Sequence, residues 1–464
     1  MKKYIIIGVL LIAIASPLVL AFFYRGKNVS PKSVTLNYWI VTDSPAYYED
    51  LVKAYRSYHP YVKINFKKIN IKEYENSLIQ GWARDAGPDI FSLPNTWLRK
   101  YQEFITPLPA QTNVAYYETK KYFFQESVSI KYIPKVSITL NDLKNNYVDV
   151  VPKNVILKDQ KGQEKIYALP YSLDTLALYF NKDLLNSAHL AEPARTWQDL
   201  VVQTTNLTKL DNQNNILQSA IALGLSSNVN NYFDILSLLM MQNGVQMVSP
   251  GNDKVAFNTG DNALLAANAL DFYTSFADLN KETYAWNEKQ TENLDSFAAG
   301  KCAYYIGYLS EKKLIEKAAP GLNFGFSGML HVNGDGSDRA VNRAGNPVEI
   351  NYTNFWVETV SKKTKAANEA WDFVQFIARE KRNKEFVEKT GKISPLKSIL
   401  AGQVKNQELA IWAQQALTAN NWYRGNNATA VEETFGNMID SVVLENVTPV
   451  EALKNAANKI NLTF

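Results

Sequence analysis

A short polar and aromatic cluster separates two apolar runs in the first half of the chain. Tyr171, Ser172 and Asp174 stand between residues 166–169 and 175–180, which are rich in residue types that favour strands. A proline precedes the cluster, as expected where a strand leaves one sheet and enters another. Hydroxyl and carboxylate groups at such a junction could hydrogen-bond a polar ligand in a cleft between two lobes. An ordinary buried β-hairpin is the alternative.

Other kinds of chemistry find little support in the sequence. Cys302 is the only cysteine, so neither an intramolecular disulfide nor a cysteine metal cluster can form. The histidines at positions 59, 189 and 331 are scattered, and none is paired in sequence with a nucleophile. With 49 basic and 45 acidic residues, the net charge of +4 gives no sign of nucleic-acid binding. We therefore expect no metal, no cofactor and no nucleic-acid partner.

The composition is that of a globular protein with many aromatic side chains. Its 464 residues, 46% of them hydrophobic and 20% charged, are enough for two or three compact units. The chain contains 26 Tyr and 9 Trp. Such side chains can simply fill cores, but they also present the flat amphipathic faces that grip sugars.

The chain begins with Met1-Lys2-Lys3 and an uncharged run from Tyr4 to Tyr24. The run is long enough to cross a bilayer as a helix. We interpret residues 1–27 as a signal anchor or a signal peptide, and the lack of a clear cleavage site favours an anchor. Residues 28–33 then form a linker, and the rest of the chain is expected outside the membrane.

Strand and helix patterns alternate in the region that follows. The predicted elements are a strand at 34–41, a helix at 45–58, a strand at 62–66, a helix at 74–82 and a strand at 89–93. This order predicts a parallel sheet with helices on its faces. Because ligands bind beyond the carboxyl ends of such strands, the loops at 39–43 and 93–97 are candidate binding loops.

Several motifs resemble those of the extracellular solute-binding proteins of ABC importers, in the sugar-binding family that includes maltose-binding protein. The run Phe180-Asn181-Lys182-Asp183-Leu184 resembles the segment that follows the first crossover between the lobes of that family. The resemblance extends from Val34 to the C-terminus. Its other motifs lie at residues 87–98, at 297–308 and 350–360, which look like the second and third crossovers, at the 391–396 turn, and at the 448–451 helix start.

The resemblance implies an α/β fold with two lobes, like that of periplasmic binding proteins, with three crossovers between the lobes. A transmembrane or signal helix would precede this fold. We expect the first lobe to contain residues 34–172 and 304–352. The second lobe is expected to contain residues 173–303 and 353–464.

The candidate ligand-binding residues are aromatic or polar side chains in the predicted cleft. Some match motif positions of the family: Tyr171, Asp174, Tyr232, Tyr308 and Trp356. Others rest on their place in loops: Trp39, Asp43, Trp97, Trp286, Trp422 and Arg424. Aromatic faces would cover the C–H faces of a sugar while the polar groups bind its hydroxyls.

The function implied is capture of a carbohydrate, of which an oligosaccharide is the leading candidate, without chemistry. A monomer anchored at the extracytoplasmic face of the membrane would deliver the sugar to the permease subunits of an ABC transporter. One alternative is a membrane-anchored carbohydrate-active enzyme, which would need two carboxyl groups facing each other about 5 to 10 Å apart across the sugar bond. A ligand sensor that uses the same clamp is the other alternative.

Overall fold

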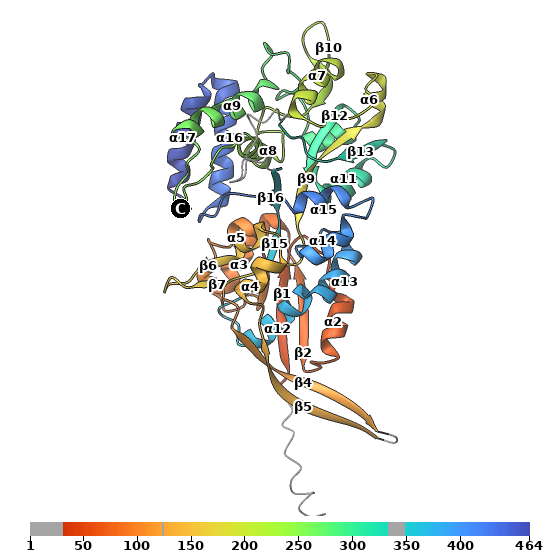
Figure 1. The fold of residues 1–464 in the computed structure, drawn as a ribbon, viewed down its shortest axis with the longest axis vertical. Helices are drawn as coiled ribbons and strands as arrows, with labels where there is room; N and C mark the ends of the chain where they lie inside the picture. Colours follow the sequence, from red (N-terminus) through yellow and green to blue (C-terminus); the bar gives the residue numbers. More distant parts are fainter. Residues whose placement is uncertain (1–30, 123–124, 333–348) are drawn as a thin grey trace, which may run out of the picture.

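The computed structural model describes residues 31–122, 125–332 and 349–464. The predicted N-terminal anchor or signal segment lies outside these residues. Among the helices that are described, none combines the length and the apolar character needed to cross a membrane. The described chain forms two α/β lobes, one above the other in Figure 1, so the predicted fold class is confirmed.

The first lobe is built on a mixed sheet. Its strand order is β2 (Val62–Lys68), β1 (Val34–Ile40), β3 (Ile90–Pro94), β15 (Trp356–Val360) and β8 (Leu169–Pro170). Strand β1 pairs in parallel with β2 and β3, as the alternating sequence pattern predicts, whereas β15 runs antiparallel to β3. The helices of this lobe are η1 (Pro45–Tyr48), α2 (Glu49–Arg56), α3 (Ile71–Ala83), η2 (Asn95–Trp97), η3 (Gln102–Phe104), α4 (Leu140–Asn146), α5 (Val150–Val155), α12 (Ala367–Ala378) and α13 (Glu380–Thr390).

Two pairs of strands stand outside the main sheet of the first lobe. A short pair joins β6 (Ile156–Lys158) and β7 (Glu164–Ile166). A long hairpin joins β4 (Gln111–Tyr122) and β5 (Gln125–Val136), and Figure 1 shows it projecting from the end of the lobe that faces away from the second lobe.

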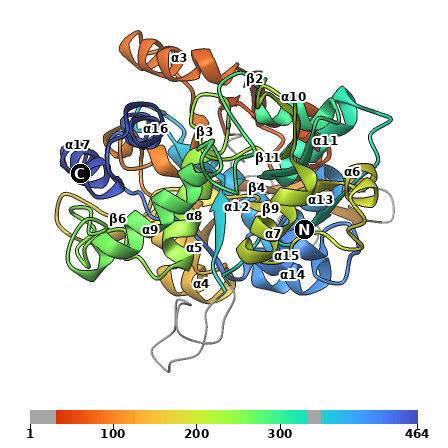
Figure 2. The same ribbon diagram turned by 90° about the horizontal axis from the view of Figure 1, so that it is seen from above.

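The second lobe is built on a sheet whose central strand, β9, pairs with three other strands. The strand order is β10 (Lys209–Leu210), β11 (Ile216–Ile221), β12 (Cys302–Tyr308), β9 (Asp174–Asn181), β14 (Asn351–Asn354) and β16 (Ala419–Asn420), and β13 (Phe324–Ser327) also pairs with β9. Its helices are α6 (Lys182–Ser187), α7 (Trp197–Leu207), α8 (Tyr232–Gln242), α9 (Asp261–Ser275), α10 (Asn293–Ala298), α11 (Leu309–Ala318), α15 (Ala410–Ala416), α16 (Ala428–Glu445) and α17 (Pro449–Asn461). Figure 2 shows α16 and α17 together at one side of this lobe, where they pack against each other.

Local sequence signals explain where several of these helices begin and end. Thr196 starts α7 with a capping box, in which its side chain accepts from the Asp199 N–H at 3.0 Å and the Asp199 carboxylate accepts from the Thr196 N–H at 3.0 Å. Thr448 caps α17 and is followed by a proline at the first helical position. Gly391 ends α13 with a φ of 72°, a left-handed conformation that glycine adopts without strain.

The chain passes between the lobes at two of the three predicted crossovers. Between β8 and β9 it leaves the first sheet and enters the second, which confirms the crossover at residues 166–180. Between β14 and β15 it returns to the first sheet, which confirms the crossover at residues 350–360. A third passage follows α13 and leads past α14 (Lys397–Gln403) to α15, which packs on β9.

The second predicted crossover, at residues 297–308, is wrong. Strand β12 is buried along its whole length between β11 and β9, so this apolar run is a central strand of the second sheet. The expected division into lobes changes with it. Residues 304–352 belong with the second sheet rather than the first, and β15, α12 and α13 belong with the first sheet rather than the second.

Candidate functional site

A cavity of about 1070 Å³ lies where the two lobes meet. Both confirmed crossovers, a strand-end loop of the first lobe, the starts of α8 and α11 in the second lobe, and the turn after α13 contribute to its wall. The main lining residues used below are Asp43, Asn95, Asp174, Phe233, Asp234, Tyr308, Lys313, Asn354, Phe355, Trp356, Thr390, Lys392 and Glu432. Both lobes therefore offer side chains to the same space.

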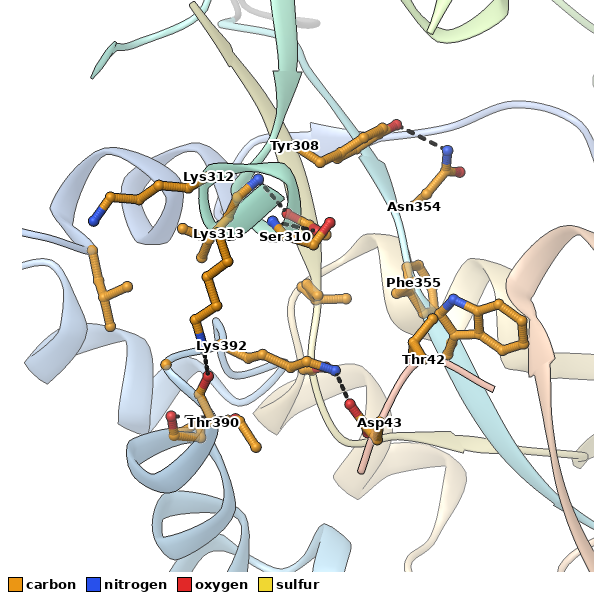
Figure 3. Close-up of a pocket in the computed structure, with 18 of the residues that line it drawn as sticks. Thr42, Asp43, Tyr308, Ser310, Lys312, Lys313, Asn354, Phe355, Thr390 and Lys392 are labelled. Atoms are coloured by element: carbon orange, nitrogen blue, oxygen red, sulfur yellow. Dashed lines mark hydrogen bonds and ion pairs between the residues drawn. The ribbon is translucent and has the colours of Figure 1, made fainter. Parts of the chain in front are cut away.

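Three polar side chains hydrogen-bond one another on the second-lobe side of the cavity. The Tyr308 hydroxyl donates to the Asp234 carboxylate at 2.7 Å, and the Asn354 amide donates to the same oxygen at 2.8 Å. The Asn354 amide also lies 2.9 Å from the Tyr308 hydroxyl oxygen, as Figure 3 shows. We call Asp234, Tyr308 and Asn354 the polar trio. Its members come from α8, β12 and β14, so tertiary structure alone brings them together.

Burial controls the charge of this trio. Removal of Asp234 from water raises the pKa of its carboxyl group to about 7, although the hydrogen bonds from Tyr308 and Asn354 oppose the shift. The nearby Glu432 carboxylate, which also lines the cavity, adds to the rise. A carboxyl group that titrates near neutral pH can either accept or donate a hydrogen bond.

Aromatic side chains lie next to the trio. Phe355 and Trp356 follow Asn354 directly at the crossover between β14 and β15, and Phe233 precedes Asp234 at the start of α8. Trp356 is half-buried and meets Tyr74 edge to face at 6.4 Å. The wall thus combines flat apolar surfaces with hydrogen-bonding groups within a few residues of chain.

The opposite part of the wall carries lysines. Lys392, in the turn after α13, forms an ion pair with Asp43, whose other oxygen accepts from the Tyr48 hydroxyl at 2.9 Å. Figure 3 shows this pair and Lys313, which donates to the Thr390 carbonyl at 3.3 Å. Because Lys313 is on α11 and Thr390 is on α13, this hydrogen bond joins the two lobes across the cavity.

Asp174 lines the cavity, but the fold uses both of its oxygens. They accept from the backbone N–H groups of Leu309 at 2.8 Å and Ser310 at 3.1 Å, at the start of α11. Burial raises the pKa of Asp174 to about 6, and the hydrogen bonds from Ser310 and Leu309 oppose the rise. Asp174 therefore caps a helix that begins 135 residues later in the chain.

Three first-lobe candidates lie away from the cavity lining. Trp39 is buried beneath α3, and Lys67 lies over its ring at 4.6 Å. Trp97 packs against Tyr101 and is also outside the cavity lining. Tyr171 is buried behind the first crossover, where its hydroxyl donates to the Val374 carbonyl at 3.3 Å.

Three second-lobe candidates also have other partners. Tyr232 is not part of the cavity lining, and its hydroxyl donates to the carbonyl of Glu432, which is. The hydrogen bond is 3.0 Å long, and the neighbouring Phe233 also belongs to the lining. The fully buried Trp286 donates to the Asn228 side chain at 2.7 Å. Trp422 is buried and donates to Ser237 at 2.9 Å.

Arg424 lies against a second opening, of about 870 Å³, which α5 and β16 help to line. Its guanidinium donates to the Lys153 carbonyl at 3.0 Å and to the Asn421 carbonyl at 3.1 Å. Burial lowers its pKa to about 10. Arg424 thus connects the two lobes away from the candidate site.

Of the candidates from the sequence, the cavity brings together Asp43, Asp174, Tyr308 and Trp356. The sequence prediction missed Asn95, Asp234, Asn354 and Phe355 as cavity residues. Asn354 and Phe355 immediately precede Trp356 in a segment already interpreted as a crossover, and that position was the available signal. For Asp234 the only signal was its place just after an asparagine-rich loop.

Asn95 connects the cavity to the junction between the lobes. The side-chain oxygen of Asn95 accepts from the Phe355 N–H at 3.1 Å, and its side-chain amide nitrogen donates to the Asn154 side chain at 3.1 Å. Asn154 in turn donates to Asn421 of the second lobe at 3.0 Å. These three asparagines are buried, so the junction behind Phe355 is held by a continuous set of hydrogen bonds.

Two α/β lobes, strand crossovers between them and a mixed polar and aromatic cavity at the junction define a two-lobed ligand-binding protein. Comparison with protein families is more specific, since residues 50–418 match the model for bacterial extracellular solute-binding proteins. The chain belongs to this family.

Solved structures share the fold over nearly the whole chain. A cyclic α-maltosyl-1,6-maltose binding protein from Arthrobacter globiformis is 18% identical with a TM-score of 0.70, and the match covers 93% of this chain and 98% of that one. A maltose-binding periplasmic protein from Listeria monocytogenes, in complex with maltose, is 15% identical with a TM-score of 0.66, over 92% and 97%. An ABC transporter solute-binding protein from Thermotoga lettingae, bound with α-D-tagatose, is 18% identical with a TM-score of 0.64, over 93% and 100%.

Proposed function

We propose that this solute-binding protein captures a carbohydrate between its lobes. The observation that carries the proposal is the composition of the cavity wall, where the polar trio stands directly beside Phe355 and Trp356. A sugar has apolar C–H faces and a rim of hydroxyl groups. Aromatic rings cover the former, and carboxylate, amide and hydroxyl groups exchange hydrogen bonds with the latter.

An oligosaccharide is the preferred ligand class. The cavity of about 1070 Å³ is slightly larger than the range of about 300 to 1,000 Å³ that is usual for small-molecule pockets. Two of the solved relatives described above support the same class, since one is named for cyclic α-maltosyl-1,6-maltose and the other is in complex with maltose. The third, bound with the monosaccharide α-D-tagatose, supports a carbohydrate in general. The contacts proposed here are Asp43, Asp234, Tyr308, Asn354, Phe355 and Trp356.

Capture requires movement of the lobes rather than chemistry. Ligand contacts from both lobes stabilise a closed arrangement, and the contact between Lys313 and Thr390 is one that such a movement would change. We further propose that the closed monomer is presented to the permease subunits of an ABC transporter. In this proposal residues 4–24 anchor the protein at the extracytoplasmic face of the membrane.

A ligand screen tests the proposal directly. A ligand that binds only the folded state raises the melting temperature, so mono- and oligosaccharides should be added to the full-length protein one at a time. We expect at least one oligosaccharide to raise the melting temperature, and the rise to shrink in a Trp356→Ala variant. A complete panel without any shift would contradict the carbohydrate assignment.

The same samples separate the alternatives. Chromatography of the sugar after long incubation should recover it unchanged, whereas shorter products would indicate a carbohydrate-active enzyme. Co-purification with permease subunits from membranes would favour transport, and recovery with a signalling protein instead would favour the sensor.

A further inference from the structure

The hairpin formed by β4 and β5 packs on the first lobe only near its base, where β4 contacts α12 and Val114 and Ala115 are buried. Figure 1 shows it extending beyond the main sheet. Each strand has 12 residues, which corresponds to roughly 40 Å of extended chain. In the described part of the chain β5 pairs with β4 alone, so its outer edge has no strand beside it.

One face of β5 carries a continuous apolar stripe. Residues directly opposite each other share a face of an antiparallel pair, and side chains alternate between faces along a strand. The register therefore places every second residue of β5 on one face, beginning with Val128, which is paired with Thr119, and ending with Val136, which is paired with Gln111. We call the residues of this face the hairpin stripe: Val128, Ile130, Tyr132, Pro134 and Val136.

The hairpin stripe is exposed except at Ile130, which is partly buried against the core. Val128 is 50% exposed, Tyr132 is 56% exposed and Val136 is 71% exposed. A two-stranded hairpin is only marginally stable in water without a partner for its apolar face. Strand addition is a poor solution here, because Pro134 has no N–H to offer a new strand along the free edge. A surface that covers the face, rather than the edge, fits the hairpin better.

The base of the hairpin lies beside the point where the described chain begins. Tyr61 contacts both places, because its carbonyl accepts from the Val34 N–H at 2.9 Å and its hydroxyl accepts from the Ala115 N–H at 3.1 Å. Only residues 25–33 separate Val34 from the uncharged run that ends at Tyr24. Fully extended, these nine residues span at most roughly 30 Å, which is less than the length of the hairpin.

The charge of the hairpin and of residues 25–33 also favours a position next to the membrane. Residues 111–136 contain four lysines and two glutamates, a net charge of 4 − 2 = +2. Residues 25–33 add Arg25, Lys27 and Lys32 and contain no acidic residue. Basic residues next to a membrane segment are attracted to anionic lipid headgroups.

We propose that the hairpin stripe lies on the bilayer surface, with its apolar side chains at the boundary between headgroups and acyl chains. The proposal rests on the predicted membrane anchor. It adds a second point of contact, which would restrict how the first lobe is oriented above the membrane. Tyr132 is suited to this position because tyrosine favours the membrane–water interface.

A fluorescent label at position 132 tests the proposal in the full-length protein. Cys302 is fully buried and burial raises the pKa of its thiol to about 12, so a thiol-reactive dye should label an introduced cysteine instead. We would label Tyr132→Cys and the control Leu217→Cys, a residue of β11 in the second lobe that is 64% exposed. Both proteins would be reconstituted in vesicles that contain anionic lipid, with and without nitroxide-labelled lipids.

We expect nitroxide lipids to quench the dye at position 132 at least about twofold more strongly than the dye at position 217. Equal quenching at the two positions would overturn the proposal. So would energy transfer between hairpins of two molecules without lipid quenching, which would assign the stripe to a second copy. Carbonate extraction of the same vesicles reports separately on the anchor, so the failure of one idea can be distinguished from the failure of the other.

Discussion

The β8–β9 and β14–β15 crossovers both carry polar and aromatic residues but use their polar groups differently. At the β8–β9 crossover the polar groups are hydrogen-bonded within the protein, because Tyr171 donates to Val374 and Asp174 accepts from two N–H groups of α11. At the β14–β15 crossover, Asn354 bonds to Asp234 and Tyr308, both of which line the cavity.

This difference separates structural from ligand-facing polar groups. A carboxylate bonded to the backbone N–H groups at a helix start cannot exchange partners without leaving them unsatisfied, since the described residues offer those N–H groups no other acceptor. Side chains bonded to other side chains at a cavity wall can rotate and exchange partners with a ligand. We therefore expect substitutions at the β8–β9 crossover to change stability and substitutions at the β14–β15 crossover to change affinity.

The largest expected effect on stability is that of Asp174→Ala. The substitution leaves the N–H groups of Leu309 and Ser310 without their acceptor, and a buried unsatisfied group costs about 1 to 3 kcal/mol, so we expect a loss of about 2 to 3 kcal/mol. Chemical denaturation measures this loss. Sugar affinity, measured by calorimetric titration below the melting temperature, should change far less. A large loss of affinity with unchanged stability would show instead that Asp174 contacts the ligand.

The next largest effect is on affinity, for Trp356→Ala. Removing an aromatic face that stacks on a sugar should weaken binding about tenfold to a hundredfold, where each tenfold corresponds to about 1.4 kcal/mol. Trp97→Ala is the matched control, because Trp97 lies three residues after β3 and packs on Tyr101 outside the cavity lining. Equal losses of affinity in the two variants would contradict the position proposed for the ligand.

Much of the fold could be predicted from the sequence because its signals are local. Alternating strands and helices, the cap at Thr196 and the turn at Gly391 depend on residues within a few positions of one another. The error at β12 has a physical cause. A fully buried central strand and a strand that crosses between lobes are both short apolar runs, and only the pairing with β9 and β11 distinguishes them.

The site was less predictable because an aromatic residue looks the same in a core and in a cleft. Trp286 and Trp356 have the same chemistry, and only packing by distant segments decides that the former is fully buried and the latter half-buried. The members of the polar trio come from three elements that are more than forty residues apart, so no spacing in the sequence predicts that they meet.

The third prediction concerns pH and the polar trio. Asp234 has a pKa of about 7 in the folded protein against an ordinary value of 3.8, so the folded state binds more protons between these values. The stability contribution of this group is fully present below its unfolded pKa and is lost as the pH rises through about 7. Between about pH 5.5 and pH 8 the natural protein should lose at least about 1 kcal/mol relative to Asp234→Asn, which does not titrate.

Denaturation curves of both proteins at each pH measure this difference. Burial also raises the pKa of Asp174 to about 6 and that of Glu358 to about 7, and these groups act in the same direction. They are present in both proteins and cancel in the comparison. Parallel stability curves for the two proteins would show that Asp234 keeps an ordinary pKa.

The smallest effects come from two Tyr→Phe substitutions. Each removes one tyrosine hydroxyl, in one case beside the β8–β9 crossover and in the other from the polar trio. In Tyr171→Phe the Val374 carbonyl loses one hydrogen bond of 3.3 Å, so stability should fall by about 0.5 to 1.5 kcal/mol while affinity stays constant. In Tyr308→Phe the lost hydroxyl is the one that bonds both Asp234 and Asn354 beside the cavity. Sugar affinity should fall several-fold, because the aromatic ring remains but one hydrogen-bonding group of the wall is gone. Sugar titration and denaturation of both variants test this difference. If both variants lost the same amount of affinity and the same amount of stability, the two crossovers would not differ in the way that their contacts imply.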